Sequence, residues 1–73
     1  METYHLVAEG KLWKLRKEGA NGAPIMFNSK ELAIEQSVAL MRYRGGSLRI
    51  HKHDGTFEER TYHRNTDRRR SRG

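Results

Sequence analysis

The sequence predicts an α+β domain in which an antiparallel sheet of four or five short strands packs one face against a single helix. Three observations lead to this prediction. Apolar and polar residues alternate near both ends of the chain body, apolar residues recur at helical spacing only between residues 30 and 44, and glycine-containing turns separate these segments. The chain has 73 residues and no cysteine. We therefore expect one small domain over residues 1–62, with the order β-β-(β)-α-β-β and without disulfides.

The first predicted hairpin covers residues 4–16. Its residues alternate, and Glu9-Gly10 supplies the turn because glycine takes φ > 0 at no steric cost. A two-residue loop gives two pairs on an inner face and two on an outer face: Leu6–Trp13 and Tyr4–Leu15, then His5–Lys14 and Val7–Leu12. A three-residue loop with a bulge would change this register, so both remain open.

A loop, a short strand and a helix are expected next. Residues 17–24 contain two glycines and a proline and read as a loop, whereas residues 25–27 could form a third strand. Asn28 or Ser29 is predicted to cap a helix that runs from Lys30 to about Arg44. Gly45-Gly46 ends this helix.

The second hairpin is the clearest local signal. Asp54-Gly55 is a preferred type I′ turn pair, and it joins alternating segments at residues 47–53 and 56–62. The two-residue register places three apolar residues on the inner face: Leu48, Ile50 and Phe57. On the outer face it predicts three cross-strand pairs: Arg49 with Arg60, His51 with Glu58, and Ser47 with Tyr62.

The inner faces and the apolar side of the helix together predict the core. Its expected members are Tyr4, Leu6, Trp13, Leu15, Phe27, Ala33, Ile34, Ser37, Val38, Leu40, Met41, Leu48, Ile50 and Phe57.

Four motifs in this order and spacing also carry a family resemblance: Tyr4-His5-Leu6-Val7, Trp13-x-Leu15, Phe27-x-Ser29-Lys30-Glu31-x-Ala33-Ile34, and Leu48-x-Ile50-His51-x-x-Asp54-Gly55. Over roughly residues 4–62 the chain resembles a family of short bacterial and phage proteins catalogued as a domain of unknown function, number twenty-one eighty-eight. Leu32 stands where that family often has an acid, and Ser37 where it often has alanine. The resemblance implies a compact β-β-(β)-α-β-β domain and no reaction.

Arginine dominates the last eleven residues, 63–73. Five arginines and one acid, Asp67, contribute +4 of the formal charge of +6: Arg64, Arg68, Arg69, Arg70 and Arg72. This segment has no apolar residue, so we expect a disordered tail. Clustered Lys and Arg gain free energy by releasing counterions from phosphates, which favours a polyanionic partner over a merely solubilising terminus.

Basic and aromatic side chains would also share the outer face of the sheet. The candidate nucleic-acid-binding residues there are Lys14, Arg16, Arg49, His51, Arg60 and Tyr62. Arginine and lysine would hold phosphates while Tyr62 or a histidine stacks on a base. With the tail arginines, this predicts a non-catalytic nucleic-acid-binding protein of weak sequence preference, with DNA and RNA both open. An ordinary solvated face is the alternative interpretation of the same residues.

A second function class stays open, a structural or regulatory protein-interaction module that is homodimeric. Val7 and Leu12 would form an apolar pair on the outer face, and a domain this small has a thin core that gains from further burial. Under this hypothesis the arginines would meet acidic residues of a protein partner.

Other classes are expected to be excluded. Glu58 and Glu59 are adjacent on a strand and face opposite ways, so they cannot act as a carboxylate pair. His51-x-His53 lacks enough converging ligands for a metal, unless His5 joins them through one particular strand order. We expect no catalytic residue, metal, cofactor or small-molecule substrate. No segment reads as a signal peptide or membrane helix, so a cytoplasmic location is expected.

Overall fold

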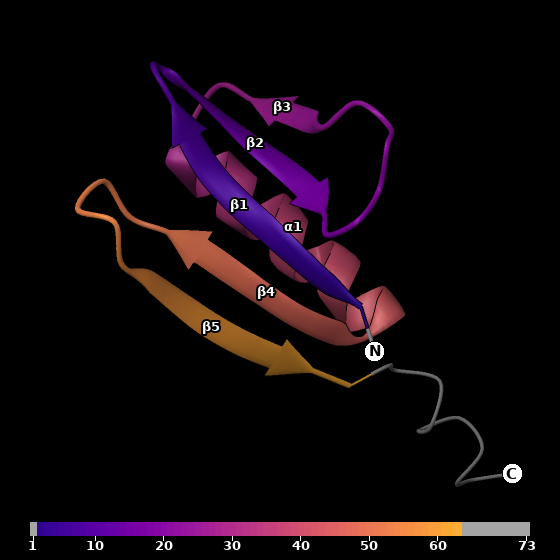
Figure 1. Cartoon of the computed structure of the whole chain (residues 1–73). Coiled ribbons are helices and arrows are strands. Elements are labelled where there is room, and N and C mark those ends of the chain that lie inside the picture. The colour runs from indigo at the N-terminus through magenta and orange to yellow at the C-terminus, as the bar shows by residue number, and fades with distance from the viewer. Residues whose placement is uncertain (1, 64–73) are drawn as a thin grey trace, which may run out of the picture.

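A computed structural model describes residues 2–63 and contains five strands and one helix. In chain order these are β1 (Thr3–Glu9), β2 (Leu12–Lys17), β3 (Ile25–Phe27), α1 (Lys30–Arg44), β4 (Gly46–His51) and β5 (Phe57–Tyr62). The strands form one sheet in the order β3-β2-β1-β4-β5, and α1 covers one of its faces (Figure 1). The predicted α+β class with a single helix is confirmed.

The sheet is mixed, so the prediction of a purely antiparallel sheet was wrong. β1 and β4 lie side by side at its centre and run parallel, with Thr3 aligned with Ser47 and Leu6 with Ile50. All other neighbouring strands are antiparallel. The reason is α1, which carries the chain back along the sheet so that β4 begins beside the start of β1 (Figure 1).

The first hairpin has a two-residue loop, but this loop is Gly10-Lys11 and not Glu9-Gly10. Gly10 has a φ of 64°, whereas Lys11 has a negative φ. Leu6 therefore lies opposite Leu15, two residues from the predicted register. Because a shift of two residues preserves the face of every side chain, the predicted inner and outer sets are confirmed although the individual pairs were wrong.

The second hairpin has a three-residue loop, residues 53–55, in place of the predicted two-residue turn. The Gly55 N–H donates to the Lys52 carbonyl at 3.2 Å, and the Lys52 N–H donates to the Thr56 carbonyl at 2.8 Å. Gly55 has a φ of 94°, and Asp54 Oδ1 accepts a hydrogen bond from the Thr56 N–H at 3.0 Å. This is the geometry of a type I turn followed by a glycine bulge.

The longer loop shifts the β4–β5 register by one residue and turns β5 over. The observed pairs include Arg49 with Glu59, His51 with Phe57, Leu48 with Arg60, Ile50 with Glu58, and Gly46 with Tyr62. Three predicted pairs were therefore wrong: Arg49–Arg60, His51–Glu58 and Ser47–Tyr62. Arg60 and Tyr62 lie on the helix side of the sheet, and Phe57 lies on the opposite side.

The ends of α1 follow local rules. Ser29 is the N-cap, and its Oγ accepts a hydrogen bond from the Leu32 N–H at 3.1 Å. At the other end, Gly45 has a φ of 80° and its N–H donates to the Met41 carbonyl at 2.7 Å. Of the two predicted caps, the structure therefore selects Ser29.

The core lies between α1 and the three central strands. Its buried members are Tyr4, Leu6, Leu15, Ala33, Ser37, Met41, Leu48 and Ile50. Partly buried residues pack around them: Trp13, Phe27, Ile34, Val38, Leu40 and Tyr62. Phe57 was wrongly placed in the core. It is 46% exposed, because the register shift turns it away and brings Tyr62 to the core instead.

The predicted disordered tail, apart from His63, lies outside the described residues, and so do its five arginines. Across residues 2–63, no helix combines the length and the apolar character needed to cross a membrane.

Candidate nucleic-acid interface

The sheet face opposite α1 is uncovered in the described part of the chain, and we call it the open face (Figure 1). The strand registers align its side chains in two rows. The first row contains Met26, Lys14, Val7, His51 and Phe57. The second row contains Arg16, His5, Arg49 and Glu59. The first row is thus mainly apolar and aromatic, with Lys14 as its one cation, and it runs beside a row of charged and polar groups.

Three side chains of β4 and β5 form a stacked cluster on the open face. The ring centroids of His51 and Phe57 lie 5.4 Å apart at an interplanar angle of 46°. The Arg49 guanidinium carbon lies 5.1 Å from the Phe57 ring centroid, within the range of a cation–π contact. The cluster combines an exposed aromatic ring with a flat cation that lies over it.

A hydrogen-bonded relay orders the His51 ring. Glu18 Oε1 lies 2.8 Å from His5 Nε2, and His5 Nδ1 lies 3.0 Å from His51 Nε2. With both rings neutral, His5 Nε2–H donates to the carboxylate, so His5 Nδ1 accepts from His51 Nε2–H. The hydrogen bond from His5 lowers the pKa of Glu18. Burial, followed by the nearby charges of His5 and Arg49, lowers the pKa of His51.

The cations of the open face are only partly neutralised. Lys14 Nζ lies 2.9 Å from Glu9 Oε1, and Arg49 Nε lies 3.3 Å from Glu59 Oε1. The buried Arg49 Nε nevertheless makes no hydrogen bond of good geometry to any described residue. Ion pairs between exposed side chains contribute little net stability, so an incoming phosphate can replace these carboxylates at low cost.

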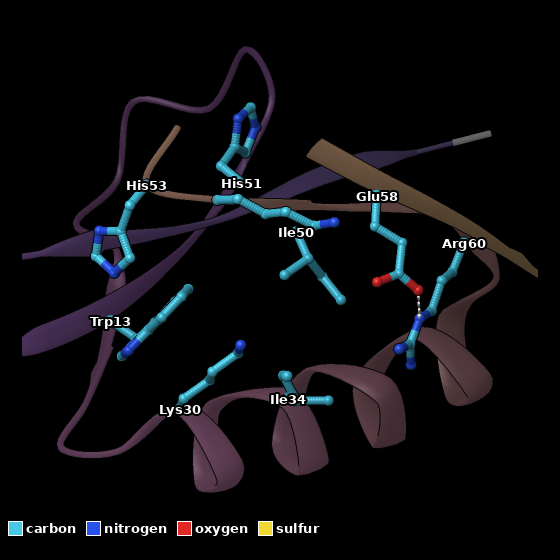
Figure 2. Close-up of a pocket in the computed structure, with 9 residues that line it drawn as sticks. Trp13, Lys30, Ile34, Ile50, His51, His53, Glu58 and Arg60 are labelled. Atoms are coloured by element: carbon cyan, nitrogen blue, oxygen red, sulfur yellow. Dashed lines mark hydrogen bonds and ion pairs between the residues drawn. The ribbon is translucent and has the colours of Figure 1, made fainter. Parts of the chain in front are cut away.

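A separate cavity opens on the helix side, between α1 and β5, and we call it the groove (Figure 2). The described residues that line it are Trp13, Lys30, Ile34, Ile50, His51, Lys52, His53, Glu58 and Arg60. Arg60 Nε donates to Glu58 Oε2 at 2.7 Å. This hydrogen bond is the largest cause of both the lowered pKa of Glu58 and the raised pKa of Arg60.

The predicted site residues are divided between these two surfaces. Lys14, Arg16, Arg49 and His51 share the open face, as predicted, but Arg60 and Tyr62 do not join them. The common plane predicted for Arg49 and Arg60 was therefore wrong. Sequence reasoning also missed Phe57 as a surface residue. A signal was present, since Phe57 and Tyr62 have opposite parity in β5 and only one can face the helix.

The histidines do not converge either. β1 and β4 are neighbours, which brings His5 to His51, but His53 lies elsewhere with its ring 6.2 Å from Trp13. Figure 2 shows the His51 ring pointing away from the groove, which His53 lines. Among the described residues, no group of three or more potential ligands could hold a metal ion.

Comparison with known proteins identifies the family but no close relative. Neither the comparison with curated proteins nor that with solved structures gives a significant match. One family model, described as an uncharacterized protein conserved in bacteria, matches residues 4–63. This match covers all six elements except the first residue of β1. The chain therefore belongs to that family, DUF2188, as its motifs suggested.

Proposed function

We propose that this protein is a non-catalytic nucleic-acid-binding protein that holds single-stranded DNA or RNA on its open face with weak sequence preference. One observation carries the proposal: Phe57 is exposed and stands beside His51 and the Arg49 guanidinium on an uncovered sheet face. An aromatic ring on a β-sheet surface offers a stacking site to an unpaired base, because every base has a π-face. Stacking requires no reacting group.

The second row of the open face supports the phosphate part of the proposal. Arg16 and Arg49 flank His5 in this row, next to the row that holds Phe57. A strand whose base stacks on Phe57 would therefore place its backbone over guanidinium groups. Contacts of this kind position the backbone without reading sequence, which is consistent with weak sequence preference.

The composition of the chain adds charge to this surface. Residues 2–63 hold ten Lys/Arg and eight Asp/Glu, which gives +2, and residues 64–73 add +4. We propose that the terminal arginines contact phosphates beyond those held on the open face. Arg60 and Tyr62 have no part in the open-face contact, since their side chains lie on the other side of the sheet.

The test is a binding titration with a labelled single-stranded oligonucleotide at low salt, followed by fluorescence anisotropy. Phe57→Leu keeps apolar bulk and removes the stacking ring, so it should weaken binding about fivefold or more. The matched control is Tyr43→Leu, because Tyr43 is a 76% exposed aromatic on α1. Equal affinities of these two variants would contradict the stacking site, and no binding at low salt would contradict the proposal.

Charge is tested with a second pair of variants. Arg49→Gln should weaken binding and reduce the salt slope by about 0.7 per lost phosphate contact. Arg42→Gln, at an exposed position in the last turn of α1, removes the same charge away from the open face. Deleting residues 64–73 should reduce the slope further. If the deletion does not change the salt slope, the terminal arginines do not contact phosphates. The open face is then tested by the Phe57→Leu and Arg49→Gln variants alone.

A specific observation favours a second candidate, a homodimer formed through the same face. Leu12 and Met26 on the open face are 39% and 44% exposed, and Val7 lies between their strands and the stacked cluster. Exposed apolar side chains near each other on an uncovered sheet are typical of an interaction surface. Sedimentation at several protein concentrations separates the candidates. A tight dimer that oligonucleotide does not dissociate would favour the protein-interaction module, and a monomer would exclude it.

A further inference from the structure

The groove between α1 and β5 exists because the helix packs on β1 to β4 and leaves the last strand largely uncovered (Figure 1). Its volume is about 420 Å³, within the range of roughly 300–1,000 Å³ typical of small-molecule pockets. Ile34 of α1 and Ile50 of β4 give it an apolar wall (Figure 2). It lies on the other side of the sheet from Phe57, and of the described residues proposed to hold a nucleic acid strand His51 alone also borders it.

The charge around the groove is predominantly positive. Lys30 at the first turn of α1, Lys52 after β4 and Arg60 of β5 line it, against one carboxylate, Glu58. Glu58 and Arg60 share β5, whereas the two lysines come from α1 and from the loop after β4, so the fold brings the three segments together. Three cations around a single carboxylate are complementary to an anion with more than one negative oxygen.

Flat groups occupy the end of the groove near the β1–β2 hairpin. The Trp13 and His53 rings meet edge to face, with centroids 6.2 Å apart and an interplanar angle of 71°. Lys30 Nζ lies 6.0 Å from the Trp13 ring centroid. Figure 2 shows both rings on the same side of the cavity as Lys30, facing Glu58 and Arg60 across it. A ligand that spans the groove would thus meet aromatic surface at one end and a guanidinium at the other.

From this combination we infer that the groove binds a nucleoside monophosphate as a free ligand, with its base against Trp13 and His53 and its phosphate at Arg60 and Lys52. The apolar wall and the two rings suit a planar base. The cations suit a phosphate dianion, which accepts charge-assisted hydrogen bonds from guanidinium and ammonium groups. This is a binding site and needs no reaction.

Glu58 opposes this ligand. Its carboxylate already accepts the hydrogen bond of Arg60 Nε at 2.7 Å, so a phosphate must compete for that guanidinium or use its remaining N–H groups. Among the described residues Glu58 is the one carboxylate that lines the groove, and Glu58→Gln replaces its charge with a neutral amide oxygen that holds the Arg60 guanidinium less strongly. It should therefore tighten binding, whereas the loss of a groove cation should weaken it.

Trp13 is the only tryptophan of the chain, so its fluorescence reports on the groove directly. The experiment titrates the full-length protein with AMP, adenosine and inorganic phosphate in parallel, at low salt. The expected result is a saturable fluorescence change with AMP, and binding at least about tenfold weaker with adenosine or phosphate alone. Equal binding of phosphate would overturn recognition of the base, equal binding of adenosine would overturn the role of the cations, and no change with AMP would overturn the site.

Variants place the ligand. Lys30→Gln and Arg60→Gln should each weaken AMP binding about three- to tenfold, and Glu58→Gln should strengthen it. Phe57→Leu and Arg42→Gln should leave it unchanged, since both residues lie away from the groove. AMP binding that is lost in Phe57→Leu would assign the nucleotide to the open face and overturn the groove. Because oligonucleotide binding is measured with Phe57→Leu and nucleotide binding with Lys30→Gln, either proposal can fail without the other.

Discussion

Gly46→Ala adds a single methyl group and should lower the free energy of unfolding of this domain strongly, for two reasons that can be tested separately. Gly46 has a φ of 130°, which L side chains rarely adopt, and strain of this kind costs about 1–3 kcal/mol. A Cβ at this position would also overlap the backbone carbonyl of Glu2. That carbonyl accepts the Ser47 N–H at 2.8 Å and so joins β1 to β4.

The two terms can be added. Moving the Glu2 carbonyl aside loses a backbone hydrogen bond worth about 1 kcal/mol, which with the strain gives a total of about 2–4 kcal/mol. A body of this size has a free energy of unfolding of only about 3–9 kcal/mol. Urea unfolding followed by Trp13 fluorescence and far-UV circular dichroism measures the loss.

Alanine variants of two other glycines distinguish the cost of backbone strain from the cost of overlap with the Glu2 carbonyl. Gly55→Ala has the strain alone, since Gly55 has a φ of 94° and open space around it, and should cost about 1–2 kcal/mol. Gly22→Ala has neither and should lie within about 1 kcal/mol of the parent protein, on the stabilising side. If Gly46→Ala costs no more than Gly55→Ala, the Glu2 carbonyl does not lie over Gly46 and the parallel β1–β4 pairing is wrong.

Three further predictions concern stability. Ser37→Ala should raise the free energy of unfolding by about 1 kcal/mol, because the buried Ser37 hydroxyl has no hydrogen-bond partner among the described residues; a lower thermal midpoint would contradict this. Leu48→Ala should cost about 2–5 kcal/mol and the half-exposed Phe57→Ala clearly less in the same urea titration; equal losses would return Phe57 to the core. Acid should destabilise the protein. The pKa of His51 is lowered in the folded state, so as the pH falls below 6.5 the unfolded chain takes up a proton at His51 before the folded chain does, and the free energy of unfolding decreases. The lowered pKa of Glu18 continues this decrease below pH 4.5. Urea midpoints at pH 7.5 should therefore exceed those at pH 5.5, His51→Gln should flatten this difference, and a midpoint that rises with acid would contradict the relay.

Local signals in the sequence were sufficient to predict the elements. Alternation located the strands of both hairpins, and glycine at residues 45 and 46 ended the helix near Arg44 as expected. In the first hairpin the inner residues occupy every second position of each strand: Tyr4, Leu6, Trp13 and Leu15. An error of two residues in the pairing therefore did not change which side chains of this hairpin face the helix and which lie on the open face.

The second hairpin shows why the site was only partly predictable. Asp54-Gly55 fits a two-residue turn, but glycine also supplies the positive φ of a bulge after a type I turn. Alternation in β5 could not decide between them, because its aromatic residues, Phe57 and Tyr62, lie five positions apart and face opposite ways. The choice depends on packing, since Tyr62 joins the core beside Gly46. One residue of register then moves Arg60 from the open face to the groove.

Local sequence signals could not predict that β1 and β4 are neighbours in the sheet. These strands are joined through β2, β3 and α1, and no turn signal links their sequences. Their pairing nevertheless brings His5 to His51 and aligns His5 with Arg49, so the relay on the open face is a product of topology.

The most direct test of the open-face proposal is an amide chemical-shift titration of the full-length protein with a single-stranded oligonucleotide. The largest shifts should fall on residues 49–51 and 57–59, with smaller shifts in β1 and β2 at His5 and Arg16. Shifts confined to residues 64–73, or to the groove around Lys30 and Arg60, would contradict binding on the open face.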